Sequence, residues 1–344
     1  MNHRFHLAAA AAVFAALAAC ATSAPPRTWP SVGRVTALDP SFNRIVASDA
    51  RIEKIAEGMT WAEGPTWVRK GGYLLFTDVP KNKLYRWSEK DGLSVLLEPS
   101  GYAGPDDGTL REAGANGLFT EPQGTVLLAD SGSRAVARLD PRTKAKIVLA
   151  AKFEGKRFNS PNDVVRRSDG TVFFTDPPYG LKGIDRSPVR ELAFSGVFRL
   201  DTDGSVHLLD DSLKYPNGIV LSPDERHLYV SNSDPAKPVW TVYALDARGA
   251  VTEKHVFADA TDLVRAGGQG NPDGMCMAAD GKLFTSAPGG LLVFDTDGKR
   301  LGRIETGSTV SNCTFGDDGR TLYMTSSNFI ARVRVGVAGL GFGR

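Results

Sequence analysis

Residues 215–233 read YPNGIVLSPDERHLYVSNS, and this stretch decides the fold because its pattern recurs along the chain. A polar residue, Asn217, stands directly before a short apolar segment. A turn carrying Pro223 and Asp224 follows, and a second apolar segment comes after the turn. Short apolar segments separated by such turns are typical of antiparallel β-strands.

The pattern occurs six times, and successive copies begin 38 to 56 residues apart. This spacing suits a four-stranded propeller blade. No segment shows a sustained helical period with caps, which argues against an α/β sheet. The sequence therefore predicts an all-β fold, a six-bladed β-propeller. The first residues of the six copies are Glu63, Asn116, Asn162, Asn217, Asp273 and Ser311.

Residues 51–57, RIEKIAE, form one further strand-like segment ahead of the first copy. We expect it to pair into the last blade, because this pairing closes the ring and removes its open edge. Residues 41–344 then make a single domain. Two long Gly-, Pro- and charge-rich loops, 100–115 and 180–196, are expected to overhang one face of the ring and to shape access to it.

The first residues of the copies are expected to form a ring near the axis, since the innermost strand of each blade lines the central channel. All six carry a side-chain oxygen. Asn, Asp and Ser could stand there only as turn formers, but Glu63 is a poor turn residue. Carboxylates and amide oxygens without thiol or imidazole suit one divalent cation, Ca²⁺ first, with Mg²⁺, Zn²⁺ or Mn²⁺ as alternatives.

Charge balance and the positions of the histidines argue against nucleic-acid binding and against His-based catalytic sites. Lys and Arg number 41 against 39 Asp and Glu, a balance that gives no support to nucleic-acid binding. None of the five His residues follows the ring position, so a His-rich zinc site and a Ser-His-Asp triad are poorly supported. Nothing indicates an obligate oligomer, and we expect a monomer.

The N-terminus reads as an export signal, with a basic start and an apolar Ala-rich stretch ending at Cys20. Leu17 to Cys20 resembles a bacterial lipoprotein box, in which the cysteine is lipidated; a plain cleaved signal peptide is the alternative. Residues 1–20 are then the signal, residues 21–40 a flexible tether, and the protein is periplasmic and lipid-anchored. The remaining cysteines, Cys276 and Cys313, lie in apolar segments and are expected to be free and buried.

Four separated motifs resemble the senescence marker protein/gluconolactonase family, which includes regucalcin. They are WAEGPTW, FNSPNDVVRRSDGTVFFTDPPYGL, YPNGIVLSPDERHLYVSNS and NPDGMCMAADGKLF, and the PPYG form is similar to bacterial gluconolactonase-like members. The resemblance implies a propeller that holds one divalent cation and hydrolyses sugar lactones. It also implies that the metal ligands are Glu63, Asn162, Asn217 and Asp273, with Asn162 shared between metal and substrate and Asn116 less firmly placed.

The hypothesis for the chemistry is attack of a metal-activated water on the lactone carbonyl, with Asp273 as the general base. Asn116, Asn162, Asp176, Tyr179 and Arg134 are the candidate substrate-binding residues. For the last three, the alternative is packing of a strand end against the next blade. Two other functions stay open: a hydrolase of another lactone or an organophosphate, and a calcium-stabilised propeller that binds a ligand or protein without catalysis.

Overall fold

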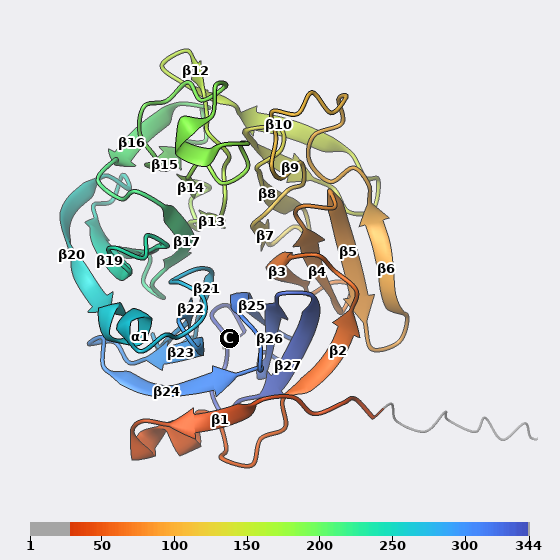
Figure 1. Cartoon of the computed structure of the whole chain (residues 1–344), viewed down its shortest axis with the longest axis vertical. Helices are drawn as coiled ribbons and strands as arrows, with labels where there is room; N and C mark the ends of the chain where they lie inside the picture. The colour runs from red at the N-terminus through yellow and green to blue at the C-terminus, as the bar shows by residue number, and fades with distance from the viewer. Residues whose placement is uncertain (1–27, 343–344) are drawn as a thin grey trace, which may run out of the picture.

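The computed structural model describes residues 28–342, and its strands form six antiparallel sheets around a central axis (Figure 1). Blade one contains β3 (Ala62–Val68), β4 (Tyr73–Asp78), β5 (Lys83–Ser88) and β6 (Gly92–Leu97). Blade two contains β7 (Leu118–Thr120), β8 (Val126–Asp130), β9 (Ala135–Leu139) and β10 (Lys146–Ala150). Blade three contains β13 (Val164–Arg166), β14 (Val172–Asp176), β15 (Gly196–Leu200) and β16 (Val206–Asp210).

The other three blades repeat this order from the axis outward. Blade four contains β17 (Pro216–Leu221), β18 (His227–Asn232), β19 (Val239–Leu245) and β20 (Val251–Asp259). Blade five contains β21 (Met275–Met277), β22 (Leu283–Ala287), β23 (Gly290–Phe294) and β24 (Arg300–Glu305). Blade six contains β25 (Val310–Gly316), β26 (Thr321–Ser326), β27 (Phe329–Arg334) and, outermost, β2 (Glu53–Glu57). The predicted six-bladed propeller is confirmed.

Ring closure also follows the prediction, because β2 pairs antiparallel with β27. Its register sets Glu53 opposite Arg332, and the two side chains form an ion pair at 2.8 Å. Ile55 of β2 is 3% exposed and packs in the core that blades one and six share. The first and last parts of the chain are therefore joined within one sheet.

The segment expected to be a tether is partly structured. Strand β1 (Arg34–Ala37) adds a fifth strand to blade five by pairing with β24, and Arg34 contacts Glu305 at 2.8 Å. The prediction of a flexible tether is thus wrong for residues 34–37, because their backbone pairs with an otherwise open sheet edge. The predicted signal and Cys20 lie outside the described residues, and no helix within residues 28–342 is long and apolar enough to cross a membrane.

Packing between blades is apolar and aromatic. The second strands β8, β14 and β22 are buried along their whole length. Phe158, Phe174 and Phe198 form one aromatic cluster, in which ring centroids lie 5.1 to 5.4 Å apart. Such burial makes the ring rigid and fixes the inner strand ends in space.

The two long loops contact each other. Leu110 and Leu181 form an isolated bridge, and the Lys182 amide donates to the Thr109 carbonyl at 2.8 Å. These two loops therefore make one joined cover that spans blades one to three. The remaining short elements are the hairpin β11 (Lys152–Phe153) and β12 (Lys156–Arg157), the 3-10 turns η1 (Pro40–Arg44) and η2 (Ile184–Arg186), and α1 (Thr261–Arg265).

Candidate functional site

The six ring residues lie at the inner strand ends of neighbouring blades, as their repeat position predicts. The Gly117 amide of blade two donates to the Asn162 carbonyl of blade three at 2.7 Å. The Gly274 amide of blade five donates to the Ser311 carbonyl of blade six at 2.8 Å, and the Ser311 hydroxyl donates to the Ala62 carbonyl of blade one at 2.6 Å. The chain of contacts brings the ring residues together around the axis.

A hydroxyl residue at the end of a second strand holds the ring backbone of the next blade. Thr77 donates to the Asn116 carbonyl at 3.1 Å, Thr175 donates to the Asn217 carbonyl at 2.6 Å, and Ser231 donates to the Asp273 carbonyl at 2.8 Å. These bonds fix the ring residues relative to one another across the blade boundaries.

The residue after that hydroxyl holds the loop that leads into the ring residue of its own blade. Asp176 accepts from the backbone amides of Asn159 and Ser160 at 2.7 and 2.8 Å, and it is fully buried. Asp78 accepts from two backbone amides in the same way in blade one. Asp176 is therefore a structural residue, and the expectation that it lines the mouth of the site is wrong.

Arg134 also departs from its expected position. It is 2% exposed, and its guanidinium donates to the carbonyls of Phe158 at 2.6 Å and Val189 at 2.9 Å. Burial lowers its pKa. Arg134 of blade two thus packs against blade three and holds its loops by hydrogen bonds. This is the alternative stated for Arg134, and the expectation that it binds substrate is wrong.

Three carboxylates of alternate blades face one another near the axis. Burial raises the pKa of Glu63 to about 8, and the charge of Asp163 adds to the rise. Burial raises the pKa of Asp163 to about 7. Burial and the charges of Glu63 and Asp163 raise the pKa of Asp273 well above its usual range. The three groups therefore repel one another when ionised.

Hydrogen bonds fix the orientation of these carboxylates. Glu63 accepts from Trp61 Nε1 at 3.3 Å and from its neighbour Gly64 at 3.1 Å. Asp163 accepts from the backbone amides of Val164 at 2.9 Å and Ile219 at 3.2 Å. Asp273 is only partly buried as a residue, whereas the other five ring residues are buried.

Oxygen donors without a cationic partner suit a bound cation. Among residues 28–342, no Lys or Arg forms an ion pair with Glu63, Asp163 or Asp273, and no group of three or more His, Cys, Asp or Glu side chains is positioned for a metal. A cation here would therefore need amide oxygens as well. Asn217 donates through Nδ2 to the Ser233 hydroxyl at 2.9 Å, which leaves its Oδ1 to act as a ligand.

The remaining ring residues divide into two groups. Asn116 and Asn162 are each 6% exposed, and in ring order they stand between Glu63 and Asn217. Ser311 is fully buried, and its hydroxyl bonds to the Ala62 carbonyl and to Thr325 at 2.8 Å. Ser311 thus joins the ring backbone of blades six and one and is not available as a ligand.

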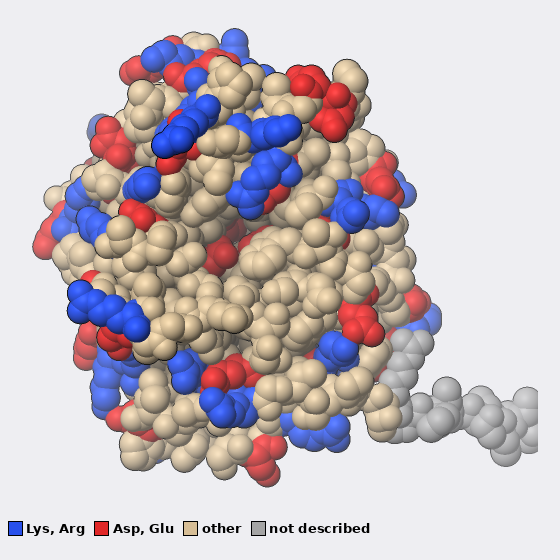
Figure 2. Space-filling view, viewed as in Figure 1, with Lys and Arg blue, Asp and Glu red and all other residues tan. Residues whose placement is uncertain are grey.

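Tyr179 lies beside Asp273, as a substrate-binding residue would. Its ring packs against that of Tyr215 with centroids 5.2 Å apart. Burial raises the pKa of its hydroxyl, and the charge of Asp273 adds to the rise. The Tyr215 carbonyl accepts from the Ser233 amide at 2.9 Å, and the Ser233 hydroxyl donates to the carbonyl of Pro272, the residue before Asp273. Figure 2 shows acidic atoms at the bottom of the central hollow on the face viewed.

Sequence reasoning missed Asp163 and Asn312. Each stands directly after a ring residue, at a position where the other four blades carry Gly64, Gly117, Gly218 and Gly274. A side chain at Gly274 would collide with Asn312, since a Cβ there would come within 2.0 Å of its amide carbon. Four of the six copies carry Gly at this position, and the two copies that carry a polar residue instead are the signal that would have revealed Asp163 and Asn312.

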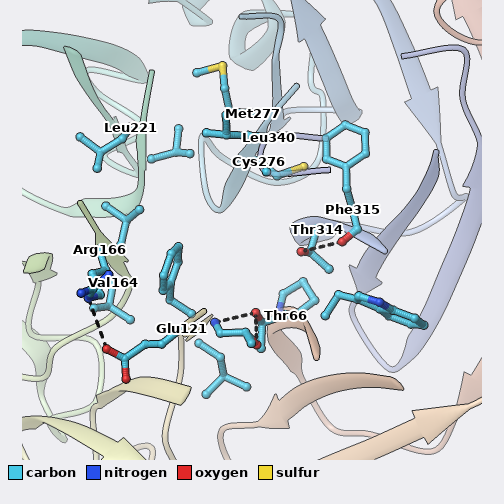
Figure 3. A pocket seen from close by; sticks show the side chains of 18 of the residues that line it. Thr66, Glu121, Val164, Arg166, Leu221, Cys276, Met277, Thr314, Phe315 and Leu340 are labelled. Atoms are coloured by element: carbon cyan, nitrogen blue, oxygen red, sulfur yellow. Dashed lines mark hydrogen bonds and ion pairs between the residues drawn. The ribbon is translucent and has the colours of Figure 1, made fainter. Parts of the chain in front are cut away.

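A cavity of about 830 Å³ opens at the other end of the inner strands. Its lining includes Asp163 and Asn312 but none of the six ring residues. Glu121 and Arg166 form an ion pair at 3.4 Å in its wall (Figure 3). Cys276 and Cys313 also line it. Both thiols are free, as predicted, but only Cys313 is buried; Cys276 is partly exposed, so the prediction of burial is wrong for it. The axis therefore has a ring end and a cavity end, which Asp163 and Asn312 separate.

Comparison with known proteins agrees with this architecture. The chain is 44% identical over 308 residues to a gluconolactonase from Zymomonas mobilis, a match that covers 88% of this chain and 86% of the relative. It is 29% identical to the pentonolactonase XacC of Haloferax volcanii, over 77% of this chain and 81% of that protein.

A solved gluconolactonase from Xanthomonas campestris superposes with a TM-score of 0.76 at 31% identity, covering 90% of this chain and 99% of that one. The family model described as SMP-30/Gluconolactonase/LRE-like region matches residues 61–328, which include all six ring residues and the strands from β3 to β26. The chain therefore belongs to the SMP-30/gluconolactonase family.

Proposed function

We propose that this protein is a metal-dependent hydrolase that opens sugar lactones. The observation that carries the proposal is the set of oxygen donors at the axis, in which buried carboxylates without cationic partners stand beside amide oxygens. Membership of a family that includes gluconolactonases supports the substrate class. A lactone is an uncharged cyclic ester, so its binding needs no basic patch.

Glu63, Asn162, Asn217 and Asp273 are the residues that would hold the cation, Ca²⁺ in the first place, with Mg²⁺, Zn²⁺ or Mn²⁺ as alternatives. A divalent cation bound there would polarise the lactone carbonyl and stabilise negative charge on its oxygen. Glu63 is buried and held by two hydrogen bonds, which suits a fixed ligand. The amide of Asn217 is oriented by Ser233.

Asp273 is the candidate general base, which takes a proton from the attacking water. It is the only ring residue that is not fully buried. Tyr179 lies beside Asp273 and would orient the substrate against it.

The test follows acid release from D-glucono-1,5-lactone by purified protein, with and without a chelator. Activity should disappear on metal removal and return when Ca²⁺ is added. Asn217→Ala should lower turnover, because it removes an amide ligand. Asn328→Ala, which changes an exposed turn outside the ring, should not.

Each rival function predicts a different result. Metal-dependent turnover of another lactone or an organophosphate, without turnover of glucono-1,5-lactone, would favour a related hydrolase. A stabilising cation without turnover of any ester would favour a binding propeller. Activity that survives complete metal removal would contradict the mechanism.

We propose in addition that the protein is exported and held at a bacterial membrane through a lipid on Cys20, as a monomer. The apolar stretch ahead of this cysteine in the sequence supports export. Cys20→Ser should then release the protein from the membrane fraction.

A further inference from the structure

Glu112 is a buried carboxylate on the loop between blades one and two, and no role described above uses it. The residue is 8% exposed, although it belongs to a connecting loop. Carboxylates in loops are normally exposed, because burial of a charge without compensation is costly. Its burial therefore calls for a functional or structural reason.

The backbone around Glu112 is fixed to three blades. The amides of Arg111 and Glu112 both donate to the Gly180 carbonyl of blade three, at 2.8 and 3.2 Å. The Gly114 amide donates to the Val79 carbonyl of blade one at 3.0 Å, and the Gly132 amide of blade two donates to Gly114 at 3.1 Å. The Glu112 side chain thus starts from a rigid position.

This position lies over the ring end of the axis. The Gly180 carbonyl, which accepts from the Glu112 amide, follows Tyr179, and the Tyr179 ring packs on that of Tyr215. The Tyr215 carbonyl accepts from the Ser233 amide at 2.9 Å, and the Ser233 hydroxyl donates to the carbonyl of Pro272, the residue before Asp273. Glu112 and Asp273, the candidate base, therefore lie at the same end of the axis, although Glu112 is on the loop between blades one and two and Asp273 is in blade five.

One oxygen of Glu112 has a partner and the other has none. Oε1 lies 2.7 Å from Nη2 of Arg111, whose side chain is 48% exposed. Within the described residues, Oε2 accepts no hydrogen bond. An ionised carboxylate only accepts hydrogen bonds, so its free oxygen is suited to a hydroxyl donor. Sugar lactones carry several such hydroxyls, and unsubstituted lactones carry none.

We propose that Glu112 is a specificity-determining residue, whose free oxygen accepts a hydrogen bond from a hydroxyl of a polyhydroxylated lactone. This inference rests on the proposed lactonase function and narrows its substrate class. Arg111 holds Glu112 in place from the solvent side. A substrate without the hydroxyl makes no hydrogen bond to Oε2 and leaves it to water, so the site favours the hydroxylated lactone.

The experiment compares D-glucono-1,5-lactone with δ-valerolactone, which has the same ester ring and no hydroxyl groups. Glu112→Gln should lower kcat/KM for glucono-1,5-lactone by about tenfold or more, since a hydrogen bond to a charged acceptor is replaced by a weaker one. The value for δ-valerolactone should stay unchanged. Asp106→Asn is the matched control, because it removes a carboxylate from an exposed part of the same loop and should change neither value.

An equal loss for both lactones would overturn the proposal, because it would place Glu112 in the reaction or in the scaffold. Unchanged values for both would show that Glu112 does not contact the substrate, and this result also overturns it. Binding of D-gluconolactam, measured by calorimetry, separates specificity from turnover. If the wild type hydrolyses neither lactone but binds the lactam through Glu112, the proposed function fails and the recognition role stands. If the lactam binds equally well to Glu112→Gln, the recognition role fails.

Discussion

At the residue scale, the site depends on which side chain occupies each of two consecutive positions at an inner strand end. The first position supplies the ring, and the second is Gly in four blades but Asp163 and Asn312 in the other two. Asp163 and Asn312 also line the cavity at the other end of the inner strands, whereas the six ring residues do not. Asp273 stands apart among the ring residues because it is partly exposed.

Asp273→Asn should lower kcat for lactone hydrolysis by roughly a hundredfold or more, the usual range for loss of a general base. Asn cannot accept the proton, although it keeps the size and one ligand oxygen. Asp280→Asn, an exposed change in the next turn of the same blade, is the control. Retention of wild-type kcat by Asp273→Asn at neutral pH would exclude Asp273 as the base.

Six ring residues could be placed from the sequence, because the repeat aligns them without knowledge of the fold. Glu112 could not, since its loop occurs once and has no counterpart in the other blades. Asp176 was misassigned for a different reason: a carboxylate at a strand end can face substrate or the backbone amides of its own blade. Only the structure shows that Asn159 and Ser160 take both of its oxygens.

At the element scale, blades three and four are joined by polar contacts at their outer strands as well as by a shared apolar core. In blade three, Asp210 ends β16 and accepts from Tyr243 Oη at 2.6 Å and from Lys254 Nζ at 2.8 Å, both in blade four. Burial alone would raise the pKa of Asp210, but the bonds from Lys254, Tyr243 and Ser212 outweigh it and lower the pKa. Asp210 therefore links two blades through its ionised form.

Asp210→Asn should reduce the free energy of unfolding at pH 7 by about 1–3 kcal/mol. Because the folded pKa lies below the unfolded value, this stabilisation is present above about pH 4 and is lost as the pH falls through the folded pKa. Urea unfolding at pH 7 and pH 3 measures the change, with the exposed Asp211→Asn as the control. A difference that is equally large at pH 3 would mean that packing, rather than charge, is responsible.

At the scale of the whole molecule, the sheet of blade six combines β2 from the N-terminal part of the chain with β25, β26 and β27 from the C-terminal part. The strands of every other blade follow one another in sequence, except that β1 is added to blade five. The number of blades was predictable from the six copies of the repeat. The closing strand was predictable because residues 51–57 precede the first copy and their pairing removes the open edge of the last blade. Strand β1 was not, since its four residues resemble a linker and pair only with an edge that the folded blade provides.

Ile55→Ala should destabilise the whole propeller by about 2–4 kcal/mol, because Ile55 fills the core where the ring closes. Val95→Ala on the outer strand of blade one, where Val95 is 43% exposed, should cost far less. Thermal unfolding followed by circular dichroism compares the two. A single cooperative transition at a lower temperature is expected for Ile55→Ala, and loss of blade six alone would contradict it.

The closing strand also determines when the protein can finish folding during synthesis. Glu53 and Arg332 are 279 positions apart, so β2 leaves the ribosome long before its partner β27 exists. Until then β2 has no edge to pair with, and blades one to five cannot form a closed ring. Long-range pairing of this kind slows folding and leaves unpaired strand edges exposed to other chains. A nascent chain of this protein must therefore be protected from aggregation until its last strand is made.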